Sequence, residues 1–357
     1  MKDNSLIDPP STSVDDLYAF MADCSRRFKE FSALAAAVEK GLFDALERRH
    51  TVEDLSKELG VQPAMTEDLC EVLCDAGLLA RTAGGYRNSD TSRTFLRKES
   101  HLFQGEVVKN LQYGFKLWEQ LGQVWENGPV LMNPGEFFAN NHFMGSLKAQ
   151  VLTGELQRTT AVVAGLPEFP EARRILDLGG GHGLYCVALC EGHPHIEGTV
   201  LDTPEMKPFA EAMFSKHNVD NVHFREGNLF TDDFGGDYDI VLLYYNPAGK
   251  NAHVLEKVRR ALKPGGVFVN KHVFYGSGDG SKSRLLDMEW NLTGLEGAAK
   301  QRRMYSFAND LSLEDYMARL QEGFDIIKIV ETSDFAAPAL ETFGDRLDSK
   351  IVVAKKR

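Results

Sequence analysis

A run of apolar residues that breaks into alternating glycines constrains this chain more than any other feature. Residues 175–183 read Ile-Leu-Asp-Leu-Gly-Gly-Gly-His-Gly. This pattern predicts a buried strand, a turn whose backbone adopts positive φ and approaches a ligand closely, and then a helix over Leu184–Cys190. Free N–H groups at the start of that helix favour polar or anionic groups. A second strand, Gly198–Asp202, ends in an acid suited to hydrogen-bonding a ribose diol. The two strands together predict a nucleotide-binding, doubly wound sheet.

The spacing of the glycines separates this turn from the dinucleotide fingerprint. In G-x-G-x-x-G the third glycine follows the second by three residues. Here Gly179, Gly181 and Gly183 each fall two apart, and Asp177 stands two residues before the first. This D-x-G-x-G-x-G spacing resembles motif I of the class I S-adenosylmethionine-dependent methyltransferases. The segments that follow resemble the same core, in the same order: Asp202, Glu226–Phe230, the strand Tyr238–Leu243, the helix Val254–Leu262, the turn Lys263–Gly266 and the strand Val267–Val269.

Strands and helices alternate through the second half of the chain. Expected strands at 174–178, 198–202, 222–225, 238–243 and 267–271 are separated by helical segments, which predicts a parallel sheet. Two further strands, Phe324–Glu331 and Lys350–Ala354, have a connection too short for a long crossover helix. The expected fold class is therefore α/β: a Rossmann-like, doubly wound, mostly parallel sheet with an antiparallel C-terminal hairpin.

The first hundred residues predict a winged-helix module. A short helix opens at Thr51, a second spans Pro63–Ala76, and a two-stranded wing turns at Gly84–Gly85. The second helix carries four acids and no lysine or arginine, so it repels phosphate, and the net charge of the chain is −12. We therefore expect no nucleic-acid partner.

Length and composition suggest several domains in one ordinary globular chain. We expect a winged-helix-like dimerisation domain over 1–100, a helical connector over 101–166 and a catalytic domain over 167–357. No apolar run approaches the ~20 residues needed to span a membrane, and the first residues lack the apolar core of a secretion signal. The expected location is cytoplasmic, without membrane association. No metal site is expected, because the His193–His195 pair falls in an expected surface loop.

Along nearly its whole length the chain resembles the small-molecule O-methyltransferases of the plant caffeate type and the bacterial natural-product type. The resemblance implies a homodimer formed through the N-terminal module, and a middle section that roofs the acceptor pocket. A flat aromatic or conjugated acceptor would suit that section. Its large side chains include Trp118, Trp125, Phe137, Phe138, Phe143 and Met144.

The same resemblance assigns the donor S-adenosylmethionine, with S-adenosylhomocysteine as product. The three glycines Gly179, Gly181 and Gly183 would lie against its amino-acid part, and Asp177 would orient either that turn or the donor's ammonium group. Asp202 would accept both ribose hydroxyls. Asn228 stands where the family usually has an aspartate facing the adenine amino group, and it still offers one acceptor and two donors. Leu229 and Phe230 would sandwich the base, Tyr244 would pack against the donor, and His182 would lie in the turn beside the ligand.

The catalytic group of the family is missing at the matching positions. The family places a general-base histidine shortly after the fourth strand, whereas this chain continues Tyr244–Lys250 and has no histidine before His253. Lys271 and Gln301 occupy the places of the two acids that orient that base. Methyl transfer would then use a different base or none.

Three residues are candidates for the missing chemistry. His272 is the first candidate base and Tyr245 the second, although a structural hydrogen bond would explain His272 equally well. Lys271 could stabilise an anionic acceptor. An acceptor that ionises easily, such as a thiol, an acidic phenol or an activated carbon, would need little help.

The sequence predicts methyl transfer to the oxygen, or to a sulfur, nitrogen or carbon, of a small acceptor. Two alternatives stay open at this point. One is an enzyme of the same fold that binds the donor but catalyses decarboxylation, hydroxylation or rearrangement. The other is a catalytically silent dimer that binds the nucleoside.

Overall fold

Alternation along the central strands determines how the larger part of the chain packs. In the computed structural model, which describes residues 10–48, 50–133, 135, 141–335, 340–342, 344 and 347–357, Ile175 faces one apolar core and Leu176 the other. Side chains of a strand point to opposite faces in turn, so a strand that is apolar at every position is buried on both sides. The central strands therefore lie between two layers of helices.

By its contacts the chain divides into two units, Met1–Val108 and Lys109–Arg357. Helix α6 (Gly105–Trp118) runs across this division. The segment beyond it, up to the first strand of the large sheet, belongs to the second unit. The domain boundaries expected at 100 and 166 remain a prediction.

The first unit contains the helices and hairpin that the sequence predicts. Thr51 caps α3 by accepting from the Asp54 N–H at 3.2 Å, and Gly60 ends that helix at φ 66°. The hairpin strands pair antiparallel from Leu79↔Asn88 to Thr82↔Gly85. The elements are α1 (Asp15–Lys40), α2 (Leu42–Ala45), α3 (Val52–Leu59), α4 (Pro63–Asp75), β1 (Leu79–Thr82), β2 (Gly85–Asn88) and α5 (Asp90–Phe95).

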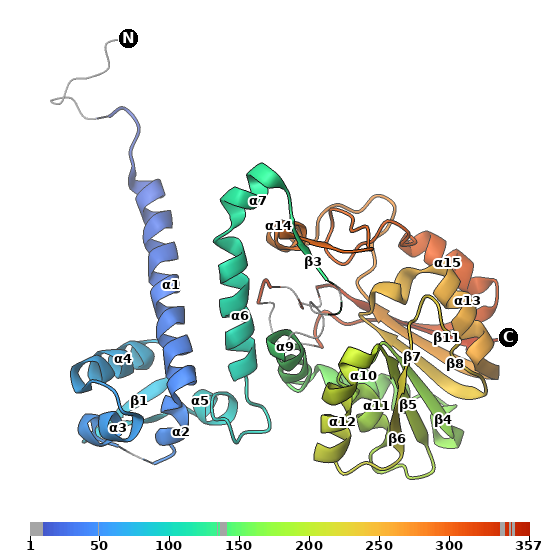
Figure 1. The fold of residues 1–357 in the computed structure, drawn as a ribbon, viewed down its shortest axis with the longest axis horizontal. Helices are drawn as coiled ribbons and strands as arrows, with labels where there is room; N and C mark the ends of the chain where they lie inside the picture. Colours follow the sequence, from blue (N-terminus) through green and yellow to red (C-terminus); the bar gives the residue numbers. More distant parts are fainter. Residues whose placement is uncertain are drawn as a thin grey trace. The chain divides into compact units, whose positions relative to one another are not determined.

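A seven-stranded sheet forms the centre of the second unit, in the order β10-β11-β8-β7-β4-β5-β6 (Figure 1). The strands β4 to β8 run parallel, and β11 pairs antiparallel with both β8 and β10, which confirms the expected C-terminal hairpin. The strands are β4 (Arg174–Leu178), β5 (Glu197–Asp202), β6 (Val222–Glu226), β7 (Tyr238–Tyr244), β8 (Leu262–His272), β10 (Phe324–Glu331) and β11 (Lys350–Lys356).

Helices cover both faces of this sheet, as the two cores require. One core joins the sheet to α10 (Glu155–Ala164), α11 (Leu184–Cys190) and α12 (Lys207–Lys216), and the other joins it to α13 (Ala252–Ala261) and α15 (Leu313–Gln321) (Figure 1). The remaining elements are the helices α7 (Leu121–Asn127), α9 (Asn141–Val151) and α14 (Arg284–Leu292), and the short parallel pair β3 (Val130–Met132) and β9 (Thr293–Leu295).

Among the described helices, none is both long and apolar enough to cross a membrane. The carboxyl ends of β4, β5, β7 and β8 meet at one edge of the sheet, with β7 as the middle strand and β4 beside it. Ligands of open α/β sheets bind outside this edge, where successive connections lead to opposite faces. The candidate site lies there.

Candidate functional site

The glycine turn after β4 adopts the backbone conformation that the sequence pattern predicts. Gly179, Gly181 and Gly183 have φ of 63°, 55° and 70°, a region that side chains with a Cβ rarely adopt. A Cβ on Gly179 would lie 2.0 Å from Nδ2 of Asn246, so the loop after β7 packs directly against the turn. A Cβ on Gly183 would lie 3.0 Å from the Phe214 ring, which gives this glycine a role in packing α11.

Asp202 holds the turn in place from the end of β5. Its Oδ2 accepts from the Gly181 N–H at 2.8 Å, and its Oδ1 accepts from the Thr203 N–H at 2.7 Å. Each carboxylate oxygen has a second acceptor position, so both remain able to bind a pair of hydroxyls. The sequence indicated the acid but not that it also organises the glycine loop.

A cavity of about 630 Å³ opens beside the turn, within the second unit. It brings together the ends of four strands with residues of α9, α11, α14 and the segment after β9. Its described lining includes Phe143, Met144, Asp177, Gly179, Gly180, Gly181, His182, Tyr185, Asp202, Glu205, Asn228, Leu229, Phe230, Tyr244, Tyr245, Asn246, His272, Trp290, Glu296, Tyr305 and Phe307. Every expected donor and catalytic residue lines this cavity except Gly183 and Lys271.

Two buried polar atoms in the lining have no hydrogen-bond partner in the described part of the chain. They are Oδ2 of Asp177, which is 1% exposed, and the hydroxyl of Tyr244, which is 8% exposed. Burial, together with the charge of Asp202, raises the pKa of Asp177 to about 7. A buried polar atom without a partner costs roughly 1–3 kcal/mol. A ligand that supplies hydrogen-bond donors at this place would remove that cost.

The residues expected around an adenine ring follow β6 and line the same cavity as the turn. Leu229 is buried, and the neighbouring Phe230 keeps 49% of its surface exposed. Oδ1 of Asn228 accepts from the Phe230 N–H at 2.8 Å, so the side-chain oxygen already stabilises the local turn. The amide nitrogen of Asn228 and the second lone pair of its oxygen are then the groups that could face a base.

His272 occupies the end of β8 and lines the cavity, but both ring nitrogens lie against carbonyl oxygens. Nδ1 is 3.0 Å from the Val273 oxygen, and Nε2 is 3.1 Å from the Asn246 oxygen. Burial, reinforced by the charge of Lys250, lowers the pKa of His272 to about 3. The ring is therefore neutral at ordinary pH. Neither nitrogen lies free to take a proton from an acceptor.

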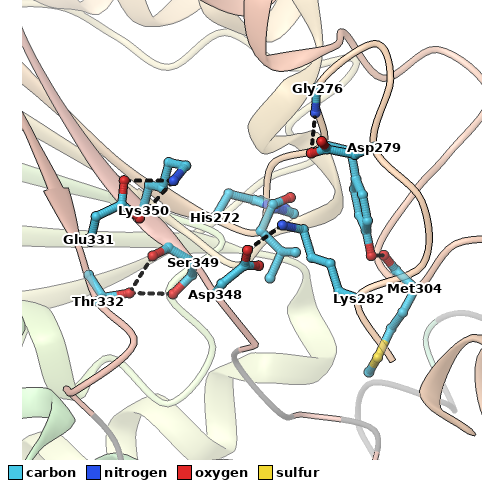
Figure 2. Close-up of polar contacts among 12 residues, drawn as sticks. His272, Gly276, Asp279, Lys282, Met304, Glu331, Thr332, Asp348, Ser349 and Lys350 are labelled. Carbon is cyan, nitrogen blue, oxygen red and sulfur yellow. Dashed lines mark hydrogen bonds and ion pairs between the residues drawn. The ribbon is translucent and has the colours of Figure 1, made fainter. Parts of the chain in front are cut away.

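The second candidate base, Tyr245, is also held by neighbours. Its hydroxyl lies 2.7 Å from the Ser349 hydroxyl. The Ser349 hydroxyl in turn lies 2.5 Å from that of Thr332, and Figure 2 shows this second contact. Burial raises the pKa of Tyr245, which opposes its acting as a base. Its backbone has φ 48°, a strained conformation for a residue other than glycine.

Lys271 lies in the core and not on the cavity wall. Its Nζ is 2.6 Å from Oε1 of Glu155 and 2.7 Å from the Thr159 hydroxyl, and the residue is fully buried. The same Glu155 oxygen accepts from the Tyr185 hydroxyl at 3.0 Å. The expected contact of Lys271 with an anionic acceptor therefore has no support from the geometry.

Three aromatic residues of the cavity wall were not expected from the sequence. Trp290 of α14 lies with its ring centroid 6.0 Å from that of Tyr305 and 5.5 Å from that of Phe307. Of the aromatic residues singled out earlier, Phe143 lines the cavity and Trp125 is 88% exposed. Phe137 and Phe138 lie outside the described residues.

Comparison with known proteins agrees with this geometry. Residues 141–308 match the O-methyltransferase domain, and residues 23–98 match the O-methyltransferase dimerisation domain. The tetracenomycin polyketide synthesis 8-O-methyl transferase TcmO of Streptomyces glaucescens is 30% identical over 66% of this chain and 72% of its own length.

The chain belongs to the O-methyltransferase family. It is thus an S-adenosylmethionine-dependent methyltransferase of small molecules that carries an N-terminal dimerisation domain. The uncharacterized protein MJ0086 of Methanocaldococcus jannaschii is 28% identical over 98% of this chain and all of its own. Human N-acetylserotonin methyltransferase, in a complex with S-adenosylmethionine, shares the fold at a TM-score of 0.68 and 20% identity, covering 98% of this chain and 99% of that one.

The residues that line the cavity of this O-methyltransferase family member fit the donor. S-adenosylmethionine carries an ammonium group, and the unpartnered carboxyl oxygen of Asp177 is the complementary acceptor. The turn at Gly179 and Gly181 leaves no side chain between the backbone and the ligand. The charge balance, the free acceptor and the open turn all agree with this cofactor.

Proposed function

We propose that this methyltransferase acts on a neutral or cationic aromatic molecule and that neither His272 nor Tyr245 serves as its general base. The observation that carries the proposal is a single cavity that joins the donor-binding turn to the aromatic wall of Trp290, Tyr305 and Phe307. When bound, S-adenosylmethionine supplies a methyl group on a sulfonium sulfur. The chain binds, orients and desolvates the two reactants.

On this proposal the donor lies along the carboxyl ends of β4, β5 and β7. Asp177 and the hydroxyl of Tyr244 hold the amino-acid part, and Asp202 accepts the ribose hydroxyls. Leu229 and Phe230 enclose the adenine ring, with Asn228 at its edge. The support for these roles is that each residue lines the same cavity as the glycine turn.

The aromatic wall favours a flat acceptor. Trp290 is 2% exposed and is packed edge-on against Phe307 at 83° between ring planes. Tyr305 and Phe307 are half-buried, so their rings, with Trp290 packed against both, offer aromatic contact area to a planar ligand. The Lys300 ammonium lies 3.9 Å from the centroid of the Trp290 ring and also bonds to backbone oxygens, which fixes the ring position.

The charge of the lining disfavours an anionic acceptor. The described residues of the cavity wall include the carboxyl groups of Asp177, Asp202, Glu205 and Glu296, and no lysine or arginine. His182 adds no charge, because burial lowers its pKa to about 4. A carboxylate or phosphate would therefore meet no fixed counter-charge among these residues, whereas a neutral or cationic molecule would be accepted.

The histidines of the described lining do not offer a free lone pair to an acceptor. Nδ1 of His182 accepts from the Leu184 N–H at 3.2 Å, and both nitrogens of His272 face carbonyl oxygens. A phenol or thiol of low pKa can enter as the neutral molecule and lose its proton to water before the transfer, so it needs no protein base. A neutral amine can also attack first and release its proton afterwards.

A homodimer is part of the proposal. The dimerisation domain covers residues 23–98, and large apolar side chains are exposed along the first helix. Contiguous exposed apolar surface marks an interface, and a second copy of the chain would cover it. These side chains are Leu17, Tyr18, Phe20, Met21 and Phe28. Light scattering of the purified protein should give twice the mass of the chain, and a monomer would contradict this part of the proposal.

The test is a turnover assay with S-adenosylmethionine labelled with deuterium on its methyl group. The acceptors are matched sets that share one aromatic ring: a phenol, a thiol, an amine and a carboxylate. We expect a labelled product together with an equal amount of S-adenosylhomocysteine, and we expect no labelled product from the carboxylate. Transfer confined to carboxylate-bearing compounds would overturn the proposed acceptor class.

A further inference from the structure

Lys250 is a buried cation outside the cavity lining, and its contacts join several parts of the cavity wall. It ends the short 3-10 helix η3 (Pro247–Lys250) after β7 and is 2% exposed. Its Nζ donates to the Tyr305 oxygen at 2.7 Å and to the Val273 oxygen at 3.3 Å, and it lies 3.0 Å from Oδ2 of Asp310. An ammonium group has three N–H donors, so these three partners use all of them.

Each partner belongs to a segment that carries residues of the cavity wall. Asn246 and Pro247 precede Lys250 in the loop after β7, and His272 precedes Val273 at the end of β8. Tyr305 itself lines the cavity. The Lys250 oxygen also accepts from the Leu311 N–H at 3.0 Å, which ties the far end of the same segment. One buried side chain thus connects three stretches of chain far apart in sequence.

The segment that carries Tyr305 needs such support because its backbone is strained. Tyr305 has φ 59°, a conformation that costs about 1 kcal/mol or more for a residue with a Cβ. The backbone oxygen of Met304, which is labelled in Figure 2, accepts a hydrogen bond from the Tyr275 hydroxyl at 3.1 Å. Asp310 accepts from the Phe307 N–H at 2.9 Å as well as pairing with Lys250.

Burying the Lys250–Asp310 ion pair is costly, so we expect the pair to have a role in ordering the chain. Moving two charges from water into the interior carries a large desolvation cost, and apolar residues of similar size are often as stabilising. Buried pairs of this kind can instead specify one arrangement of the segments they join. Here the arrangement they specify presents Tyr305 and Phe307 to the cavity beside Trp290.

We propose that Lys250 and Asp310 are positioning residues that fix the aromatic acceptor wall of the cavity. The Lys250 ammonium holds the Tyr305 carbonyl, and Asp310 holds the Phe307 amide, so the two rings face the acceptor in one orientation. This inference rests on the proposed function, because it assigns the wall to the acceptor. Donor binding should depend less on the pair, since the donor contacts Asp177, Asp202 and Leu229 lie on β4, at the end of β5 and after β6 and, within the described part of the chain, make no hydrogen bond to Lys250 or Asp310.

The test separates acceptor binding from donor binding with Lys250→Met and Asp310→Asn. Both replacements keep the approximate size of the side chain and remove its charge. The matched control is Lys263→Met. Lys263 pairs with Asp239 at 2.8 Å near the amino-terminal ends of β8 and β7, away from the cavity. The probes are S-adenosylhomocysteine by calorimetry and 1-naphthol by equilibrium dialysis against protein saturated with S-adenosylhomocysteine.

We expect each of the two variants to bind 1-naphthol at least about tenfold more weakly, with the S-adenosylhomocysteine Kd changed less than about twofold. The double variant should lose no more affinity for 1-naphthol than the single variant with the larger loss, because the two residues act as a unit. With a true acceptor, KM for that acceptor should rise more than kcat falls. A merely structural role would instead weaken both ligands together, as general destabilisation does.

Unchanged 1-naphthol binding in Asp310→Asn, which conserves shape most closely, would overturn the inference even if Lys250→Met fails to fold. Wild-type protein that binds S-adenosylhomocysteine but not 1-naphthol would overturn the aromatic wall and the inference built on it. Wild-type protein that binds neither would overturn the proposed function itself. The three failures are therefore distinct.

Discussion

Replacing Asp177 by asparagine should stabilise the ligand-free protein and weaken its donor site at the same time. The carboxyl group is 1% exposed, and its Oδ2 has no partner among the described residues. Burial and the charge of Asp202 raise its pKa from 3.8 to about 7. An isosteric amide carries no charge and avoids this conflict.

The magnitude follows from proton linkage. Between the ordinary pKa of 3.8 and the folded-state pKa of about 7, the folded protein binds more protons at Asp177 than the unfolded chain does. The free energy of unfolding therefore falls as pH rises through this window, and it stays lowered above it. Three pKa units correspond to about 4 kcal/mol, an upper value because the site can relax around the charge.

The assay is urea unfolding of ligand-free wild type and Asp177→Asn at about pH 5 and pH 8, in the same buffer series. Between pH 5 and pH 8 the variant should gain stability relative to wild type by up to about 2.5 kcal/mol, because part of the full linkage falls below pH 5. At pH 8 its affinity for S-adenosylhomocysteine should fall by roughly 2 kcal/mol, or about thirtyfold, through loss of a charged hydrogen bond. A stability difference independent of pH, or donor binding as tight as wild type, would refute the role of Asp177.

Three further predictions concern the turn, the wall and the absent base. Gly179→Ala should weaken binding of S-adenosylhomocysteine at least about tenfold in calorimetry, because the new Cβ would lie 2.0 Å from Asn246 and the backbone has φ 63°. The control Gly192→Ala, at φ 74° with no atom within 4 Å of its Cβ, should not weaken binding. Equal effects of the two substitutions would contradict the close approach at Gly179. Trp290→Leu should raise the KM for the acceptor by about tenfold and leave the Kd for the donor unchanged, because the buried Trp290 ring packs against Tyr305 and Phe307. An equal loss of donor affinity would count against the acceptor wall. His272→Asn should keep the shape of the pH profile of kcat/KM, because burial lowers the pKa of His272 to about 3; disappearance of a limb near neutral pH would restore His272 as the base.

The geometry of the glycine turn was predictable because its information is local. The positive φ of the glycines between β4 and α11 follows from the pattern of residues 175–183 alone, and Asp202 ends the adjacent strand. The doubly wound sheet followed in the same way from alternating strands and helices. These features need no knowledge of distant contacts.

The acceptor side depends on contacts between residues far apart in the sequence. Trp290, Tyr305 and Phe307 meet because Lys250 and Tyr275 hold the strained segment around Tyr305, and no local pattern encodes this. The partners of His272 were equally hidden, since the Asn246 oxygen approaches it from another strand end.

One signal was available and unused. Lys271 and His272 are consecutive in β8, so their side chains point to opposite faces of the sheet and could not both line one cavity. The structure places His272 on the cavity and Lys271 against Glu155.

The most direct test is calorimetric titration of S-adenosylhomocysteine into wild-type protein, Asp202→Ala and Lys263→Met. Asp202 holds the glycine turn and lines the cavity, whereas Lys263 pairs with Asp239 near the far edge of the sheet. We predict micromolar binding by wild type and Lys263→Met, and at least about tenfold weaker binding by Asp202→Ala. Equal binding by Asp202→Ala and wild type would contradict the placement of the donor at this turn.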